Sequence, residues 1–484
     1  MELTAASPLL SGHEVIRATG GTLLRGGADR IVRGVSTDSR EPAGDKLFIP
    51  LKGERFDGHD FLAAAVRDGA AGILVQRGKE FKVSADTAGA MVILVADTLQ
   101  ALGDLAHFWR KKFPVPVLAI TGSSGKTTTK EMAAGIIGIR KNTLSTRGNF
   151  NNLVGLPLTL FRLNEGHAAA ILELGTNTRG EIARLTRIAA PDVGIITNIG
   201  AAHLEGFKSL ATVREEKSDL FRTMGPDGIA VLNRDDEELS FLETMWRGRR
   251  VTFGVRNEAD VRAEEITGRQ DQGVRFVLKI GADREEVFLR AVGEHNVYNA
   301  LAAAAAAMAL GLGHADICRG LAAFKPVAGR MEIHRLKNGA FLIDDTYNAN
   351  PSSFREALRT LQNLRGTHDG TVIMGDMLEL GDRAEELHEE SGRLLADTGV
   401  SALFLKGVFA RATAAGAIKG GLARKRLFFP EHPGEIASLL KPQLKSGDWI
   451  LVKGSRRMQM ETAVQEILAA FGEEEDGRQT TTDN

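Results

Sequence analysis

A glycine-rich segment directly after an apolar run is the strongest constraint on how this chain folds. The apolar run covers residues 115–120, and the segment that follows reads Thr-Gly-Ser-Ser-Gly-Lys-Thr over residues 121–127. Glycines let backbone N–H groups approach phosphate oxygens, and a helix that begins there adds the positive end of its dipole. We therefore expect a phosphate-binding loop between a buried strand and a helix, in a chain that binds a nucleoside triphosphate.

The polar groups of this loop have separate expected tasks. Lys126 is placed to reach the outer phosphates, and the Thr127 hydroxyl is placed to bind a magnesium ion. The usual pattern has an earlier glycine where this sequence has Ile120, so the loop is a shortened variant. The alternative is an ordinary strand-to-helix turn with a capping hydroxyl. The expected nucleotide contacts are Thr121, Gly122, Ser123, Ser124, Gly125, Lys126, Thr127 and Thr128.

The length of 484 residues exceeds what one hydrophobic core supports and predicts about three domains. Apolar strands alternate with helical segments, which favours an α/β fold of parallel sheets with helices on both faces. Strands of the last domain are predicted over residues 341–343, 371–374, 402–405 and 449–452. The expected domains are a smaller N-terminal α/β domain at 1–113, a central nucleotide-binding domain at 114–326, a C-terminal Rossmann-like α/β domain at 327–472, and a disordered tail at 473–484.

Charge and composition exclude several classes of protein. The formal net charge of −1, without a cluster of Lys and Arg, disfavours nucleic-acid binding. The first residues lack the pattern of a signal peptide, and the alanine-rich stretch at 300–310 is too short to span a bilayer, so we expect no membrane insertion. Cys318 is the only cysteine, which rules out an internal disulfide and fits a cytoplasmic protein.

Two polar residues follow apolar strands near the predicted loop. Glu173 ends the strand predicted over residues 168–174, where a carboxylate needs a cation or hydrogen-bond donors. Glu173 is therefore a candidate magnesium ligand, and the alternative is that it caps a neighbouring helix. His203 follows the strand predicted over residues 193–197 and is a second candidate ligand, although a loop histidine is more often only hydrogen-bonded.

Lys217 lies in the apolar stripe of a predicted helix, which Thr212 and Glu215 would begin as a capping box. The residues three and four positions from it are Val213, Arg214, Leu220 and Phe221. Without an acidic partner on that face, Lys217 either extends to solvent or points into the nucleotide site. In the second arrangement desolvation would lower its pKa, and the neutral amine would react with carbon dioxide to form a carbamate that binds magnesium.

Two further polar clusters are candidate contacts. Asp345 and Asn348 come directly after a predicted strand, and Arg330 lies just upstream, so these groups suit a ribose or phosphate across a domain cleft. The alternative is an Asn-Pro turn that an aspartate begins. Asn296 and Asn299 precede an alanine-rich helix and would lie at the edge of a purine, or else only cap the helix.

Together these motifs resemble the ATP-dependent Mur ligases over nearly the whole chain. The resemblance implies that ATP and magnesium bind, and it identifies Lys217 as the family's carbamylated lysine. It implies metal ligands at Thr127, Glu173, His203 and Lys217. It implies nucleotide contacts at Asn296, Asn299, Arg330 and Asp345, in addition to the loop. It implies catalytic roles for Lys126, Lys217, His203 and Arg330.

Motifs at residues 148–152, 202–207, 345–351 and 375–381 look like those of the family member that adds D-alanyl-D-alanine. The Asp-Asn-Pro-Arg signature of members that add diaminopimelate is absent. Residues 36–40, 48–53 and 57–59 are similar to the family's uridine-nucleotide domain. The resemblance implies that a UDP-muramoyl tripeptide and D-alanyl-D-alanine are joined through an acyl phosphate, in peptidoglycan precursor synthesis, by a monomer. It implies substrate contacts at Ser39, Arg40, Lys52, Asn151, Asn152 and Asn348.

Three other functions stay open from the sequence. The first is the Mur ligase that adds the third amino acid. The second is a nucleotide-triggered binding protein, although the guanine-reading Asn-Lys-x-Asp sequence of GTPases is missing. The third is a small-molecule kinase, which would yield a stable phosphorylated product. A ligase differs from both because it releases phosphate only when acceptor and amine are present together.

Overall fold

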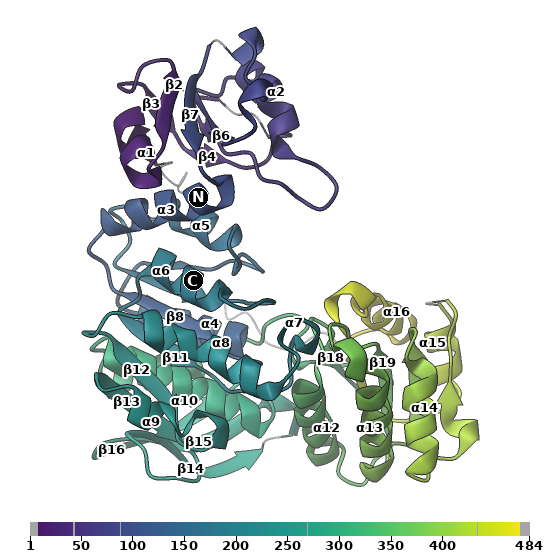
Figure 1. The fold of residues 1–484 in the computed structure, drawn as a ribbon. Helices are drawn as coiled ribbons and strands as arrows, with labels where there is room; N and C mark the ends of the chain where they lie inside the picture. Colours follow the sequence, from purple (N-terminus) through teal and green to yellow (C-terminus); the bar gives the residue numbers. More distant parts are fainter. Residues whose placement is uncertain (1–7, 42–43, 88, 269, 433, 475–484) are drawn as a thin grey trace, which may run out of the picture.

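The computed structural model of the chain describes residues 8–41, 44–87, 89–268, 270–432 and 434–474. Three large sheets follow one another along the sequence, and each carries helices of its own (Figure 1). Every apolar strand predicted from the sequence is present, so the predicted α/β architecture is confirmed. Among the described residues, no helix combines the length and the apolar character needed to cross a bilayer.

The N-terminal sheet has five strands, of which all but one pair are parallel. In spatial order they are β2 (Thr22–Arg25), β7 (Met91–Val95), β6 (Gly72–Gln76), β5 (Leu47–Phe48) and β4 (Val35–Ser36). A separate antiparallel pair is formed by β1 (Leu9–Ser11) and β3 (Ile31–Arg33). The helices of this region are α1 (Gly12–Thr19), α2 (Leu62–Arg67) and α3 (Thr98–Lys111).

The central sheet has nine strands, and its first seven in sequence are parallel. In spatial order they are β16 (Asp283–Leu289), β15 (Val274–Ile280), β14 (Val261–Gly268), β13 (Arg249–Gly254), β12 (Ile229–Asn233), β11 (Val193–Ile196), β8 (Val117–Thr121), β10 (Ala169–Glu173) and β9 (Thr143–Ser145). The helices are α4 (Lys126–Gly138), α5 (Gly155–Leu160), α6 (Glu181–Ala189), α7 (Leu204–Phe207), α8 (Leu210–Thr223), α9 (Leu242–Met245), α10 (Glu294–Ala309) and α11 (His314–Ala322).

The C-terminal sheet has six strands, with one antiparallel strand at its edge. In spatial order they are β17 (Glu332–Arg335), β18 (Phe341–Asp345), β22 (Trp449–Lys453), β19 (Gly370–Gly375), β20 (Ala402–Lys406) and β21 (Leu427–Phe428). Its helices are α12 (Pro351–Arg365), α13 (Ala384–Asp397), α14 (Ala410–Lys419), α15 (Gly434–Leu440) and α16 (Glu461–Phe471).

Strand β8 shows why helices cover both faces of the central sheet. Its side chains alternate between two apolar cores, as the period of a strand requires. Val117 and Ala119 pack in the core that contains α6 and α8, whereas Leu118 and Ile120 pack in the core that contains α4 and α10. A strand that is apolar on both faces lies between two helical layers, so its polar contacts are made where it ends, at the start of the phosphate loop.

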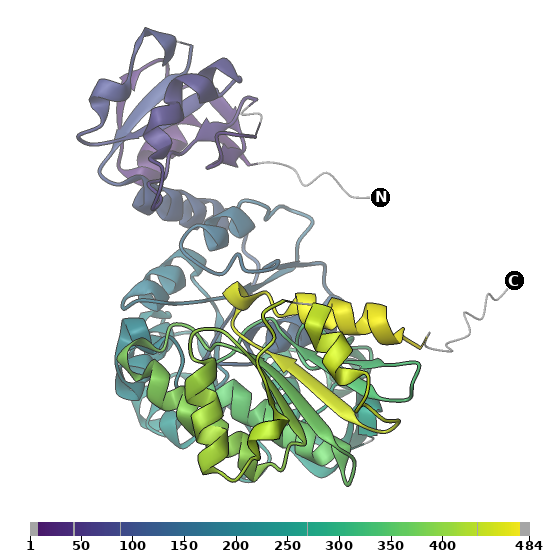
Figure 2. The same ribbon diagram turned by 90° about the vertical axis from the view of Figure 1, so that its right-hand side faces the viewer.

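The domains differ in how they contact each other. Helix α3 rests on the central domain, where the Trp109 indole donates to the carbonyl of Leu163 (3.0 Å) and Arg110 donates to the carbonyl of Ala189 (3.2 Å). The rest of the N-terminal domain stands beyond this helix, while the C-terminal domain lies beside the central domain in Figure 1 and in front of it in the turned view of Figure 2. Strand ends of the central and C-terminal sheets, among them Glu173 and Lys453, line a common cavity.

The predicted domain boundaries fall in connecting segments. The first lies between α3 and β8, and the second lies between α11 and β17. The tail was expected to begin at Glu473, which forms an isolated β-bridge with Leu336. Residues 475–484 of that predicted tail lie outside the described residues.

Candidate active site

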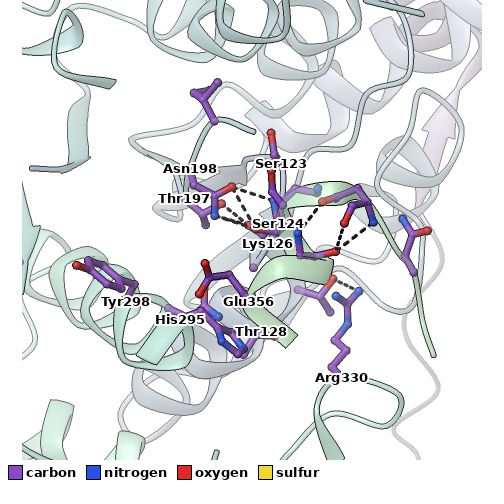
Figure 3. A pocket seen from close by; sticks show the side chains of 18 of the residues that line it. Ser123, Ser124, Lys126, Thr128, Thr197, Asn198, His295, Tyr298, Arg330 and Glu356 are labelled. Atoms are coloured by element: carbon purple, nitrogen blue, oxygen red, sulfur yellow. Dashed lines mark hydrogen bonds between the residues drawn. The ribbon is translucent and has the colours of Figure 1, made fainter. Parts of the chain in front are cut away.

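A cavity of about 830 Å³ lies between the central and C-terminal domains. Its walls include the predicted phosphate loop, the ends of β10 and β11, the start of α10, and residues from the C-terminal domain (Figure 3). Residues predicted from separate parts of the sequence thus meet at one place, because parallel strands point their carboxyl ends to the same edge.

The phosphate loop is shaped by glycines that other residues could not replace. Gly125 has a φ of +78°, and a Cβ added there would lie 2.2 Å from Oδ1 of Asn299. A Cβ on Gly122 would lie 1.9 Å from Oγ1 of Thr197. The backbone N–H of Ser124 donates to Oδ1 of Asn198 (3.0 Å), which fixes the middle of the loop. The loop therefore packs closely against the next strand and against α10, as the predicted phosphate-binding geometry requires.

Lys126, the first residue of α4, curls back over the loop. Its ammonium donates to the carbonyl of Gly122 (2.8 Å). Desolvation lowers the pKa of Lys126, Glu173 opposes this shift, and Arg330 adds to it. Lys126 and Arg330 are two cations near one carboxylate, Glu173, at the N-terminal end of helix α4. The site therefore has an excess of positive charge, which favours the binding of phosphate oxygens.

Glu173 ends strand β10 as predicted and is buried, with 3% of its surface exposed. Its carboxylate accepts hydrogen bonds from the Thr127 hydroxyl (2.8 Å) and from Nδ2 of Asn151 (2.8 Å). A carboxylate beside a hydroxyl provides the hard oxygen ligands that magnesium prefers, so Glu173 and Thr127 fit the ion. Thr127 of the loop and Asn151 thus satisfy this carboxylate, and both donors are side chains rather than the backbone N–H groups of a helix start.

Arg330 enters this group from the other side of the cleft. Its Nη2 donates to the Thr127 hydroxyl (2.7 Å), and its guanidinium lies 4.0 Å from the centre of the Tyr347 ring. Nearby, the Lys453 ammonium donates to Asp345 (2.5 Å) and to the carbonyl of Asn348 (3.0 Å). The C-terminal domain thus contributes a guanidinium to the loop while its own acid and lysine neutralise each other.

His203 lines the cavity at a strained backbone position, with a φ of +53°. Its Nδ1 contacts Oε2 of Glu379 in the C-terminal domain (2.6 Å), and the adjacent N–H of Glu205 donates to the carbonyl of Glu379 (2.9 Å). This pairing lowers the pKa of Glu379. Only Nε2 of His203 is left for a metal ion, so its role as a ligand stays a prediction.

Lys217 lies in helix α8, whose start differs from the prediction. The helix begins one turn earlier than the proposed capping box, because Ser209 caps it by accepting the N–H of Thr212 (3.2 Å). Lys217 is 2% exposed and does not extend to solvent. Burial, followed by the charge of Lys126, holds the pKa of Lys217 well below its usual value. Lys217 is not among the residues that line the cavity, although it is near enough to Lys126 for the two charges to interact.

Asn296 and Asn299 are buried at the start of α10, and both line the cavity. Asn296 donates to the carbonyl of Val292 (2.8 Å), and Asn299 donates to Oδ1 of Asn296 (3.0 Å) while it accepts from the Thr129 hydroxyl (3.3 Å). These amides therefore connect α10 to the helix of the phosphate loop. A purine contact by either amide stays a prediction.

The predicted substrate residues divide into two groups. Asn151, Asn152 and Asn348 line the cavity, although Oδ1 of Asn152 also accepts two backbone N–H groups at the start of α5. Ser39, Arg40 and Lys52 do not line it and lie in the N-terminal domain, where the exposed Arg40 pairs with Asp38 (2.6 Å). That pairing lowers the pKa of Asp38 to about 2.

Sequence reasoning missed Lys453, Asn198 and the pairing of Glu379. Lys453 ends a predicted apolar strand, which is the signal that identified Glu173. Asn198 follows another predicted strand and could have been found in the same way. The contact between Glu379 and His203 joins two domains, so no spacing in the sequence could reveal it.

Comparisons with known proteins agree with this geometry. Three family models match: Mur ligase family, catalytic domain, over residues 31–110; Mur ligase middle domain over 120–307; and Mur ligase, glutamate ligase domain, over 329–456. The chain is 34% identical over 438 residues to the UDP-N-acetylmuramoyl-tripeptide–D-alanyl-D-alanine ligase of Bacillus subtilis strain 168, which covers 90% of this chain and 93% of the relative.

Two solved structures have the same three-domain fold. MurF from Acinetobacter baumannii matches with a TM-score of 0.86 and 34% identity, over 96% of this chain and all of that one. MurF from Thermotoga maritima, solved in complex with ADP, matches with a TM-score of 0.81 and 28% identity, over 90% and 97% of the two chains. The chain therefore belongs to the Mur ligase family.

Proposed function

We propose that this chain is an ATP-dependent ligase that joins D-alanyl-D-alanine to a UDP-N-acetylmuramoyl tripeptide. The observation that carries the proposal is the cleft in which Arg330, from one domain, reaches the Thr127 hydroxyl of the phosphate loop on another. The Bacillus subtilis relative is named for this reaction, and it matches over 90% of the chain. The Thermotoga maritima structure, which contains ADP, supports ATP as the nucleotide.

In the first step, the terminal carboxylate of the tripeptide attacks the γ-phosphorus of ATP. A bond forms between the carboxylate oxygen and phosphorus, the bond to the bridging oxygen breaks, and ADP leaves. The protein supplies position and positive charge, because phosphoryl transfer needs little covalent help from side chains. Lys126 lies over the loop for the outer phosphates, and Arg330 adds a second cation from across the cleft.

In the second step, the free amine of D-alanyl-D-alanine attacks the acyl carbon. The amine loses a proton, the tetrahedral intermediate collapses, and phosphate leaves as the amide forms. Water would hydrolyse the acyl phosphate, so the cleft has to be closed during both steps. The contact of Glu205 and His203 with Glu379 joins the two domains beside the site and supports such a closed arrangement.

Thr127 and Glu173 would hold magnesium, which would neutralise phosphate charge during transfer. We also propose that Lys217 carries a carbamate, because burial and the neighbouring Lys126 favour its neutral amine. The ammonium of Lys217 has no hydrogen bond or ion pair with any residue that the structure describes. Because Lys217 is not among the residues that line the cavity, a contact of the carbamate with the metal is itself part of the proposal. A monomer and a cytoplasmic location remain further predictions of the sequence.

The test of the function measures phosphate release with each substrate alone and with both together. We expect release only with both, together with a product whose mass equals the tripeptide nucleotide plus the dipeptide minus water. Single amino acids offered with a UDP-muramoyl dipeptide test the ligase that adds the third residue. ATP cleavage without any joined product would contradict the proposal, and a stable phosphorylated product would favour a kinase.

The carbamate has a separate test in Lys217→Ala. We expect this variant to lose activity, and a short-chain carboxylic acid to restore part of it by occupying the place of the carbamate. Bicarbonate should activate the wild type after carbon dioxide has been removed, and it should not restore the variant. Full activity of Lys217→Ala without any additive would remove the carbamate from the mechanism.

A further inference from the structure

Lys130 is a second fully buried lysine, and the mechanism above does not use it. It lies on α4, four residues after Lys126, and 1% of its surface is exposed. A buried ammonium costs free energy unless hydrogen bonds and an anion compensate for it. Its contacts are the carbonyl of Thr146 (2.7 Å) and the carboxylate of Glu131, which is itself 41% exposed. The buried partner of this cation is therefore one backbone carbonyl.

Thr146 is not an arbitrary acceptor, because it holds the end of strand β10. Its hydroxyl accepts the backbone N–H of Glu173 (3.0 Å), and its own N–H donates to the carbonyl of Ile171 (3.1 Å). Thr146 is completely buried and follows β9 directly. A chain of two hydrogen bonds thus leads from the Lys130 ammonium, through Thr146, to the backbone of the candidate metal ligand.

The same carbonyl begins the segment that carries Asn151. Residues 147–152 run from Thr146 to the cavity, where Asn151 donates from Nδ2 to Glu173 (2.8 Å) and accepts the N–H of Gly175 at its carbonyl (2.8 Å). A Cβ on Gly175 would lie 2.8 Å from the Asn151 side chain, so this segment packs closely on the strand end. The carbonyl that accepts from Lys130 thus belongs to the residue that holds the Glu173 backbone, and it begins the segment that holds the Glu173 carboxylate.

We propose that Lys130 is a positioning residue for the reaction: by holding Thr146, it sets the place of the Glu173 carboxylate and of the segment 147–152 beside the phosphates. The inference rests on the proposed function, because it assigns Glu173 to the metal and Asn151 to the substrate. A lysine suits this place because its apolar stem can be buried while its ammonium donates to the Thr146 carbonyl.

The experiment compares Lys130→Met with the wild type in the full chain. Methionine keeps the length and apolar stem of the side chain but removes the donor. We expect the magnesium concentration that half-saturates ADP binding, measured by calorimetry, to rise by about 10- to 100-fold, as removal of groups that orient metal ligands commonly does. ADP binding without magnesium should stay near the wild-type value. Hydrogen exchange should accelerate over residues 146–152 and stay unchanged in the N-terminal sheet.

Two further variants identify which contact matters. Lys130→Arg keeps a cationic donor and should recover part of the magnesium affinity. Glu131→Gln removes the other partner and should change little, so an equal defect in Glu131→Gln would replace our inference with a simple ion pair. If Lys130→Met does not fold, Thr146→Val removes the acceptor of the Glu173 N–H and should show the same magnesium defect.

Lowered thermal stability of Lys130→Met with unchanged magnesium dependence, and with unchanged exchange over residues 146–152, would overturn the inference and leave the lysine a role in folding alone. Phosphate release by the wild type is measured in parallel with both substrates. A wild type that joins no substrates would refute the proposed function, and that result is distinct from any defect in the variant.

Discussion

The central and C-terminal sheets face one cleft with similar edges but opposite arrangements of charge. Each edge consists of the carboxyl ends of parallel strands, and each has a carboxylate at a strand end, Glu173 on β10 and Asp345 on β18. Asp345 lies opposite Lys453 on the next strand, and the two form an ion pair (2.5 Å). At the central edge, Lys126 and Lys217 form no ion pair with any described residue.

This difference shows which side of the cleft is built for an anion. An ion pair such as Lys453 and Asp345 holds the side chains of a site in place but leaves little net charge to attract a ligand. An ammonium over a phosphate loop, with a lowered pKa and no carboxylate partner, gains most when a phosphate arrives. We infer that the central domain binds the nucleotide charge, and that the C-terminal domain contributes Arg330 when the cleft is closed.

The largest expected effect comes from Lys126→Met, which removes the unpaired charge at the central edge. We expect kcat to fall about 1000-fold, the upper range for losing one group that stabilises developing charge. Thermal stability should change little, because among the residues that the structure describes the ammonium donates only to the carbonyl of Gly122 within the same loop. Lys111→Met, an exposed lysine on α3, is the matched control and should retain activity. A fall in kcat of less than tenfold in Lys126→Met would contradict the assignment of the phosphate-binding charge to the central domain.

Asp345→Asn tests the neutral pair of the C-terminal edge. It leaves the Lys453 ammonium, 2% exposed, without its anionic partner, so the free energy of unfolding should fall by at least about 3 kcal/mol. Denaturant unfolding followed by tryptophan fluorescence measures this change, since Trp449 lies on the same strand as Lys453. The double variant Asp345→Asn, Lys453→Met should recover most of the loss. A fall in the free energy of unfolding of less than about 1 kcal/mol is typical of a surface ion pair. That result would contradict the difference in charge pairing between the central and C-terminal sheets.

The sequence predicted the residues at the carboxyl ends of the strands better than it predicted the contacts between the two domains. Glu173 and Thr127 were found because an apolar strand that ends in a polar residue, or in glycines, carries its own signal along the chain. Lys453 carried that signal and was overlooked. The pairing of His203 with Glu379 depends on how the central and C-terminal domains are oriented toward each other. Neither the hydrophobic period nor the spacing of residues in the sequence encodes that orientation. The start of α8 differs from the prediction because Ser209 and Thr212 both fit a cap, and the Ser209 side chain is the one that accepts the N–H of a residue in the first turn.

Lys217→Met tests the cost of the other unpaired lysine. The pKa of Lys217 in the folded chain lies well below its ordinary value of 10.5, so at neutral pH the unfolded chain binds the proton more tightly, which favours the unfolded state. Methionine removes this cost, and we expect about 0.5–2 kcal/mol of added stability at pH 7 in buffer free of carbon dioxide. The gain should shrink as the pH rises toward 10.5, because the unfolded lysine then loses its proton as well. A variant less stable than the wild type at pH 7 would show that Lys217 has a partner in solution.

The smallest effect is expected for Glu379→Gln at the junction of the two edges. The His203 contact lowers the pKa of Glu379 below its usual 4.5, so the pair stabilises the fold above that value and loses its contribution as the pH falls through the lowered pKa. Glu379 is 37% exposed, and the loss at pH 7 should be at most about 1 kcal/mol. Thermal unfolding at a series of pH values from 7 downward measures the difference, which should shrink once the pH falls below 4.5 and the carboxylate takes up a proton. His388 contacts the N–H of Met377 nearby but not this pair, so His388→Gln controls for general damage to the loop. A weak junction is what the chemistry needs, since a cleft held by a strong pair would release its product slowly, and a loss of several kcal/mol would argue against a cleft that opens in each cycle.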